Sequence, residues 1–159
     1  MKFVPGQKKD AEEPLLVFQM DAHEEALLLA TLRLYPALDN SHHRLSKDPG
    51  TAGSSEQRLL EESMAQQQAA HRRKVDELFR APQRFFKEAQ GGRRLVLTGA
   101  QLEWLLQVLN DIRVGSWVKL GCPDLEKDAP LELPRANARA LQAMHLSGQF
   151  QMVLLEAVK

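Results

Sequence analysis

Two segments of the chain carry the same pattern, which constrains the fold more than any other feature of the sequence. In each segment a short apolar run leads into a capping residue and then into a leucine-rich stretch with helical spacing. The matching positions, which align without a gap, are Asp21, Glu24, Leu27, Leu28, Leu29 and Leu32 in the first segment and Thr98, Gln101, Trp104, Leu105, Leu106 and Leu109 in the second. An Asp or Thr followed one turn later by Glu or Gln is a capping box, which begins a helix. The pattern therefore predicts a unit of strand, cap and helix that is used twice.

The apolar runs before the two caps are short enough to be strands. They comprise residues 15–20 (LLVFQM) and 94–97 (RLVL). Two such strands can pair with each other and bring the two apolar helices side by side. Because caps and leucine runs are common, a chance match is the alternative, and the sequence leaves both open.

The remaining segments are predicted to be helices and loops. A long polar helix is expected from about residue 55 to about residue 80, where Pro82 breaks it, with one further short helix over 83–89. Pro134 can open a last helix over 135–158.

Two polar stretches lie at the start of the chain and after the first predicted helix. Residues 1–14 are predicted to form a loose arm, and residues 36–55, rich in Pro, Asp, Asn, Ser and Gly, a mobile loop. The whole chain, 1–159, is thus expected to be a single, mainly α domain: an irregular bundle of four or five helices with two short β-strands preceding helices one and three.

The composition restricts the class of protein. The chain has 21 Lys and Arg residues and 21 Asp and Glu residues, and this neutral balance argues against a dedicated binder of nucleic acid or of anionic membranes. Apolar runs all fall short of the roughly 20 residues of a membrane span, and the first residues lack a signal-peptide pattern. Cys122 is the only cysteine, which suits a reducing compartment. We therefore expect a cytoplasmic protein without a membrane contact.

The helix predicted from residue 99 to about residue 120 carries polar residues in an apolar run. At helical spacing its core face holds Leu105, Val108, Leu109, Ile112 and Ser116. The other side holds a candidate partner or ligand surface of Leu106, Asn110, Arg113, Val114 and Trp117, in which Arg113 and Trp117 are spaced to stack. Either a second helix of the same chain covers this side and pairs Arg113 with a carboxylate, or it is an interface, for which a homodimer is the simplest form.

The same helix resembles that of an uncharacterised bacterial family, a domain of unknown function best known from actinobacteria. Its members carry a Trp-Leu pair, then Leu-Asn-Asp-Leu-Arg, then an end with Leu-Gly. Here Trp104-Leu105 and residues 109–113 (LNDIR) match, whereas Ser116-Trp117 departs from the Leu-Gly end. The resemblance implies a mainly helical domain with no established activity. It links the chain to Clp-type proteolysis only through association, because related genes often lie beside that of the Clp adaptor.

Motifs that would carry catalysis are absent from the sequence. Phosphate-binding loops, nucleotide fingerprints and the GxSxG elbow do not occur, and His42 and His43 have no partner at a metal-ligand spacing. We therefore expect no enzyme, no metal and no cofactor. His145 lies on an apolar stripe of the last helix, which comprises Ala138, Leu141, His145, Gly148, Met152 and Leu155, and is expected to be a packing residue.

A basic segment over residues 71–94 gives the alternative function. Its candidate phosphate-contacting residues are Arg72, Arg73, Lys74, Arg80 and Arg84. The sequence favours a protein–protein interaction or regulatory protein without catalysis, whose protein partner is unknown. The alternative is a regulator that binds DNA or RNA through the basic segment, which the neutral net charge disfavours.

Overall fold

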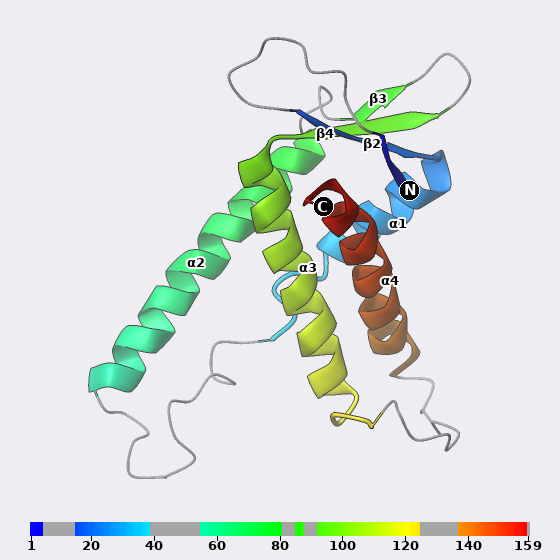
Figure 1. Ribbon diagram of the computed structural model, residues 1–159. Coiled ribbons are helices and arrows are strands. Elements are labelled where there is room, and N and C mark those ends of the chain that lie inside the picture. Colours follow the sequence, from blue (N-terminus) through cyan, green and yellow to red (C-terminus); the bar gives the residue numbers. More distant parts are fainter. Residues whose placement is uncertain (5–14, 39–54, 81–84, 88–91, 125–136, 159) are drawn as a thin grey trace.

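The computed structural model describes residues 1–4, 15–38, 55–80, 85–87, 92–124 and 137–158. Within these ranges the helices are α1 (Ala22–Leu32), α2 (Ser55–Arg80), α3 (Gly99–Lys119) and α4 (Ala138–Leu155), which continues into the short 3₁₀ helix η4 (Glu156–Val158) (Figure 1). The strands are β1 (Lys2–Val4), β2 (Leu16–Met20), β3 (Phe85–Lys87) and β4 (Arg93–Leu97). No helix of these described ranges is long and apolar enough to cross a membrane.

The predicted fold class is confirmed. The chain is mainly α, and a short strand precedes both α1 and α3, as the repeated pattern indicated. One prediction is wrong, because residues 85–87 form strand β3 where a short helix was expected. Aromatic residues fit a pleated strand well, and pairing with β4 satisfies the backbone N–H and C=O groups of this segment.

The predicted arm and loop are described only in part. Residues 2–4 of the arm form β1, which pairs antiparallel with β2, so this portion is part of the sheet. Residues 36–38 of the predicted loop pack against α3, and Ala37 is buried. The rest of the arm (5–14) and of the loop (39–54) lies outside the described residues.

The four strands form one antiparallel sheet in the order β1-β2-β4-β3. The prediction that the two strands pair with each other is confirmed, and their register is symmetric. Phe18 pairs with Leu95, and each of these residues lies three positions before its helix cap. Leu16 pairs with Leu97 at one end and Met20 with Arg93 at the other. The two hairpin–helix units, β1-β2-α1 and β3-β4-α3, are therefore related by an approximate two-fold axis through the Phe18–Leu95 pair.

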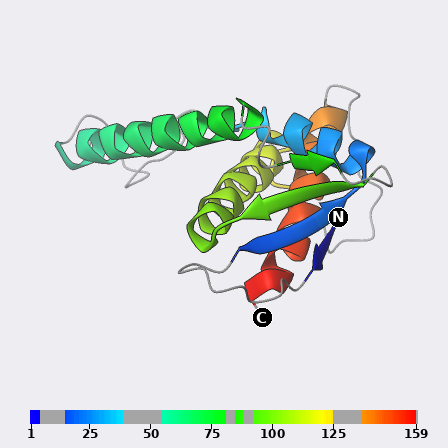
Figure 2. The ribbon, with the colours of Figure 1, turned by 90° about the horizontal axis from the view of Figure 1, so that it is seen from above.

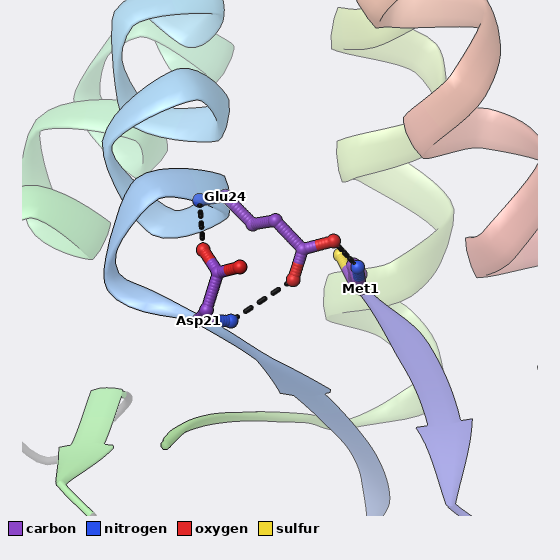
Figure 3. A network of polar contacts seen from close by, with 3 residues as sticks. All are labelled: Met1, Asp21 and Glu24. Carbon is purple, nitrogen blue, oxygen red and sulfur yellow. Dashed lines mark hydrogen bonds and ion pairs between the residues drawn. The ribbon is translucent and has the colours of Figure 1, made fainter. Parts of the chain in front are cut away.

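Both predicted capping boxes are present. Asp21 Oδ1 accepts a hydrogen bond from the Glu24 amide at 2.7 Å, and Glu24 Oε2 accepts one from the Asp21 amide at 2.9 Å. Figure 3 shows that the other oxygen of Glu24 pairs with the ammonium group of Met1, so this carboxylate joins α1 to β1. The corresponding bonds between Thr98 and Gln101 measure 3.2 and 2.9 Å. Each cap fixes the angle at which its helix leaves the sheet.

The core lies between one face of the sheet and the helices α1, α3 and α4 (Figures 1 and 2). Its largest fully buried apolar side chains come from both hairpin–helix units and from α4. They are Phe18, Leu28, Leu32, Leu95, Leu97, Leu105, Val108, Leu109, Ile112 and Leu154. Because strand side chains alternate between faces, Phe18 and Met20 of β2 and Leu95 and Leu97 of β4 all point to the helices.

Helix α2 departs from the symmetry and projects from the body, as both views show. Its C-terminal half is anchored through the buried residues His71, Val75 and Leu78. Two ring contacts reinforce this anchor, since the guanidinium of Arg33 lies 5.0 Å from the Phe79 ring centroid and the rings of His71 and Tyr35 are 6.0 Å apart. The N-terminal half reaches away, and Leu59 there is 65% exposed.

Candidate functional site

The polar residues in the middle of α3 do not lie in the core. The predicted core face is confirmed, since Leu105, Val108, Leu109, Ile112 and Ser116 are all buried. Asn110 and Arg113 are exposed, and Asp111 is half-buried. The polar groups of this helix therefore face two hollows on either side of the core stripe.

The predicted partner or ligand surface is divided between these two hollows. Arg113, Val114 and Trp117 line a groove between α3 and α4, whereas Asn110 lines a pocket between α2 and α3. Val114 borders both. Leu106 is half-buried against the core, and its carbonyl oxygen accepts a hydrogen bond from Gln151 Nε2 at 3.3 Å.

The hollow between the two helices, which we call the α3–α4 groove, is mostly apolar and has a volume of about 570 Å³. Its described lining residues are Arg113, Val114, Trp117, Met144, His145, Gly148, Gln149 and Met152. Three of its apolar residues are open to solvent: Met152 is 70% exposed, Val114 44% and Trp117 38%. The described lining holds cationic or neutral polar groups at Arg113, His145 and Gln149, and no carboxylate.

Trp117 is held in place by the turn that ends α3. Its indole Nε1 donates a hydrogen bond to the carbonyl oxygen of Pro123 at 3.0 Å. Its own carbonyl oxygen accepts from the amides of Leu120 at 3.2 Å and Cys122 at 3.1 Å. The chain can fold back in this way because Gly121 and Cys122 take positive φ angles of 82° and 56°. The exposed indole is thus a fixed part of the groove wall.

The face of α4 that was predicted to be buried is the wrong one. His145 was expected to be a packing residue, yet it is exposed, as are Met152 and Leu155 of the same stripe. The buried residues of α4 are instead Ala143, Met144, Ser147, Phe150 and Leu154. This helix has apolar residues on two sides, so its pattern does not select one of them; the side with Phe150 and Leu154 faces the sheet and the other helices. The remaining side is left to form the groove.

The sequence left open whether another helix of the chain covers Trp117. Helix α4 does pack along α3, but Val114 and Trp117 stay exposed beside it. The expected carboxylate partner of Arg113 is absent from the described residues, where its guanidinium donates to the amide oxygen of Gln151 at 3.5 Å. Helix α4 therefore covers this side of α3 only in part, and the uncovered part is the apolar groove.

The second hollow, which we call the polar pocket, lies between α2 and α3 and has a volume of about 350 Å³. Its described lining residues are Tyr35, Leu38, Met64, Gln67, Gln68, His71, Gln107, Asn110, Asp111, Val114 and Gly115. The phenol oxygen of Tyr35 lies 3.4 Å from His71 Nδ1, and Asp111 Oδ1 accepts from the Ala37 amide at 3.0 Å. Tyr35 and His71 were not predicted as site residues, because they meet only through the docking of α2. The one available signal was a histidine in the thin apolar stripe of that helix.

Burial and charge shift the titration of two groups in this pocket. Burial, assisted by the negative charge of Asp111, raises the pKa of Tyr35 to about 12. Burial and the nearby Lys74 lower the pKa of His71, against an opposing effect of Asp111. At neutral pH the pocket therefore holds a neutral phenol and an imidazole whose proton is disfavoured, next to a carboxylate.

The basic segment does not form a continuous positive face within the described residues. Arg72, Arg73, Lys74 and Arg80 are exposed on α2, and Arg84 lies outside the described residues. Asp76 and Glu77 follow Arg72 and Arg73 by one helical turn, so each acid sits beside a base. The ammonium group of Lys74 lies 6.0 Å from the Trp104 ring centroid, over the body of the protein.

The described residues also contain no cluster that could hold a metal. No group of three or more His, Cys, Asp or Glu side chains comes together among them, and His42 and His43 lie outside. The described lining of the polar pocket has no Ser, Thr or Cys that could act as a nucleophile, and Cys122 is exposed on the turn after α3.

No protein-family model, curated protein or solved structure matches this chain. The resemblance to the actinobacterial family stays a prediction, and the two hollows are the features from which a function can be proposed.

Proposed function

We propose that the protein acts without catalysis, as an interaction protein whose α3–α4 groove binds an amphipathic helix of a partner protein. The observation that carries this proposal is the exposure of Val114, Trp117 and Met152 in one apolar hollow. Soluble proteins rarely leave such a patch bare unless it binds something. A groove between two helices is a common receptor for the apolar face of a third.

The charge of the groove specifies the partner further. Arg113 and His145 stand among its described lining residues, where no carboxylate opposes them. An acidic side chain at the edge of the incoming helix would complete this arrangement, since guanidinium and carboxylate groups form strong paired hydrogen bonds. The partner segment is therefore apolar on one face and acidic at its margins.

A second copy of this chain is the other occupant to consider. In a two-fold pairing the same surface meets on both copies, so a groove-to-groove dimer would bury Arg113 against described lining residues that hold no carboxylate. A charged group that is buried at an interface without a counter-charge weakens that interface. We therefore favour a separate acidic partner over the homodimer.

A pull-down from the native cell with three forms of the protein tests this function. Met152→Glu adds a charge to the groove, whereas Leu59→Glu makes the same kind of change on the projecting part of α2. Both residues are largely exposed, at 70% and 65%, so both variants should fold. We expect the specific partner to be recovered by the wild type and by Leu59→Glu but lost with Met152→Glu. Equal recovery by all three forms would contradict the proposal.

A defined peptide gives an independent measurement. A helical peptide with leucines on one face and glutamates at its edges should change the fluorescence of Trp117, while a version with lysines in place of the glutamates should not. Trp104 is buried, so Trp117→Phe identifies the source of the signal. Equal binding of the lysine version would show that charge does not select the partner.

The sequence also suggests a pathway and a cellular compartment for this function. The family resemblance makes a component of Clp-type proteolysis the first partner to look for, and the single cysteine favours the cytoplasm. The alternative, binding of DNA or RNA by the segment 71–94, has weaker support because Asp76 and Glu77 follow the bases Arg72 and Arg73 by one helical turn on α2. A steep loss of binding with added salt would favour that alternative.

A further inference from the structure

One wall of the polar pocket is formed by the segment after α1, which packs tightly against α3. An added Cβ at Gly115 would lie only 2.5 Å from the Ala37 Cβ, so the segment after α1 packs directly on the α3 backbone. The Ala37 amide holds Asp111 Oδ1 in the same place. The volume of about 350 Å³ lies within the range of small-molecule sites, roughly 300–1,000 Å³.

The charges around this pocket select against anions. Asp111 is the only carboxylate among its described lining residues, and no Lys or Arg joins it there. Lys74 is close enough to His71 to lower the pKa of that imidazole, but its ammonium group lies over Trp104 and outside the lining. A phosphate or carboxylate ligand would therefore meet a negative group without a counter-charge.

The hydrogen-bonding groups of the pocket favour a donor. Asp111 offers its second carboxylate oxygen, for which the described residues provide no partner. The side chains of Gln67, Gln68, Gln107 and Asn110 add amide oxygens around it. Met64, Leu38 and Val114 supply apolar surface beside these groups.

We propose that the polar pocket binds a small protonated amine with an apolar body, for which Asp111 is the counter-ion. The ammonium group donates hydrogen bonds to Asp111 and to neighbouring amide oxygens, while the body of the ligand packs against Met64 and Leu38. The pocket lies on the opposite side of α3 from most of the groove, so this binding does not depend on the proposed partner helix.

Three probes of similar shape test this proposal on the full chain: phenethylamine, 2-phenylethanol and 3-phenylpropanoate. The side-chain amide resonances of Gln107 and Asn110 report binding in NMR titrations. We expect only the amine to shift them. Asp111→Asn should weaken amine binding roughly tenfold, between the effects typical of exposed and of buried charge pairs. The amide oxygen of this variant can still accept from Ala37, which preserves the fold.

Asp76→Asn provides the matched control, because Asp76 is an exposed carboxylate on α2 outside the pocket. It should leave amine binding unchanged, whereas Asn110→Asp, which adds a carboxylate to the lining, should strengthen it. The proposal is overturned if the amine does not bind at millimolar concentration, if the alcohol or the carboxylate binds equally well, or if Asp111→Asn binds the amine as the wild type does.

Discussion

Gly115 shows how a single residue sets the distance between two parts of the chain. A glycine in the middle of a helix costs about 1 kcal/mol relative to alanine, so the sequence alone suggests that Gly115→Ala would stabilise the protein. The structure predicts the opposite, because the added methyl group would meet Ala37 Cβ at 2.5 Å and its backbone carbonyl carbon at 3.3 Å. Relieving this overlap should cost about 1–3 kcal/mol and outweigh the gain in helix propensity.

Chemical denaturation of two variants measures this balance. Gly99→Ala is the control, since nothing lies within 4 Å of a Cβ added at that position. We expect Gly99→Ala to be neutral or stabilising and Gly115→Ala to be destabilising. A stabilised Gly115→Ala variant would show that residues 36–38 can move away from α3 at little cost.

The two tryptophans of α3 should differ in their contribution to stability. Trp104 is 8% exposed and belongs to the core, so Trp104→Ala should cost about 3–5 kcal/mol. Trp117 is 38% exposed and loses mainly one hydrogen bond to Pro123, so Trp117→Ala should cost roughly 1 kcal/mol. Thermal unfolding compares the two variants. A larger loss with Trp117→Ala would mean that the groove is filled within the chain.

The sequence predicted the buried face of α3 correctly and that of α4 wrongly. The core stripe of α3 was predictable because its opposite side carries Glu103, Gln107 and Asn110, which left one face for the interior. Helix α4 has apolar residues on two faces, and His145 and Met152 lie on one of them. The packing against the rest of the protein decides which face is buried, and the sequence of the helix alone does not. The pairing of Tyr35 with His71 was not predictable, because it depends on where α2 docks.

Among the elements, α2 has an attachment that should respond to pH through His71. The pKa of His71 is lower in the folded protein than its ordinary value of 6.5, so the unfolded chain binds more protons in the interval between these values. The contribution of His71 to the free energy of unfolding is then fully present above about pH 6.5, and it is lost as the pH decreases towards the lowered pKa. Among the described residues, the charged and titratable groups around His71 are Tyr35, Lys74 and Asp111, and Lys74 adds to the penalty for protonation.

Thermal unfolding of the wild type and of His71→Gln between about pH 7.5 and about pH 5 measures this effect. We expect the wild type to lose more stability on acidification than the variant, which has no group that titrates at this position. Parallel curves for the two proteins would show that His71 carries none of the pH dependence.

The two hairpin–helix units meet at the Phe18–Leu95 pair, and this contact should be cooperative. Both side chains are fully buried and directly opposite across β2 and β4. Phe18→Ala and Leu95→Ala should each cost about 2–5 kcal/mol. The double variant should cost less than the sum, because the second truncation removes contacts already lost with the first. Strict additivity in denaturant unfolding would contradict this coupling.

The elements themselves were largely predictable where local signals were strong. The capping boxes at Asp21 and Thr98 fixed the beginnings of α1 and α3 and the strands before them. Strand β3 was missed because Phe85-Phe86-Lys87 has no local pattern that separates a strand from a helical turn. Its conformation is decided by the edge of β4, which is a non-local partner.

For the whole molecule, the charge of the α3–α4 groove predicts its association state. We expect the wild type to remain monomeric in sedimentation experiments up to high micromolar concentration, because a symmetric pairing of grooves would bury Arg113 without a carboxylate from the described lining of either copy. A dimer that forms with increasing concentration, and that Met152→Glu abolishes, would instead make a second copy the occupant of the groove.

The ends of the sheet have a consequence for how the protein behaves when it is concentrated. As described, its outer strands β1 and β3 are each three residues long. A strand of another molecule finds few free backbone N–H and C=O groups on such an edge, and short edges are a recognised way in which natural sheets avoid growing from one molecule into the next. The described edges of the sheet are thus poorly suited to seed amyloid-like fibres.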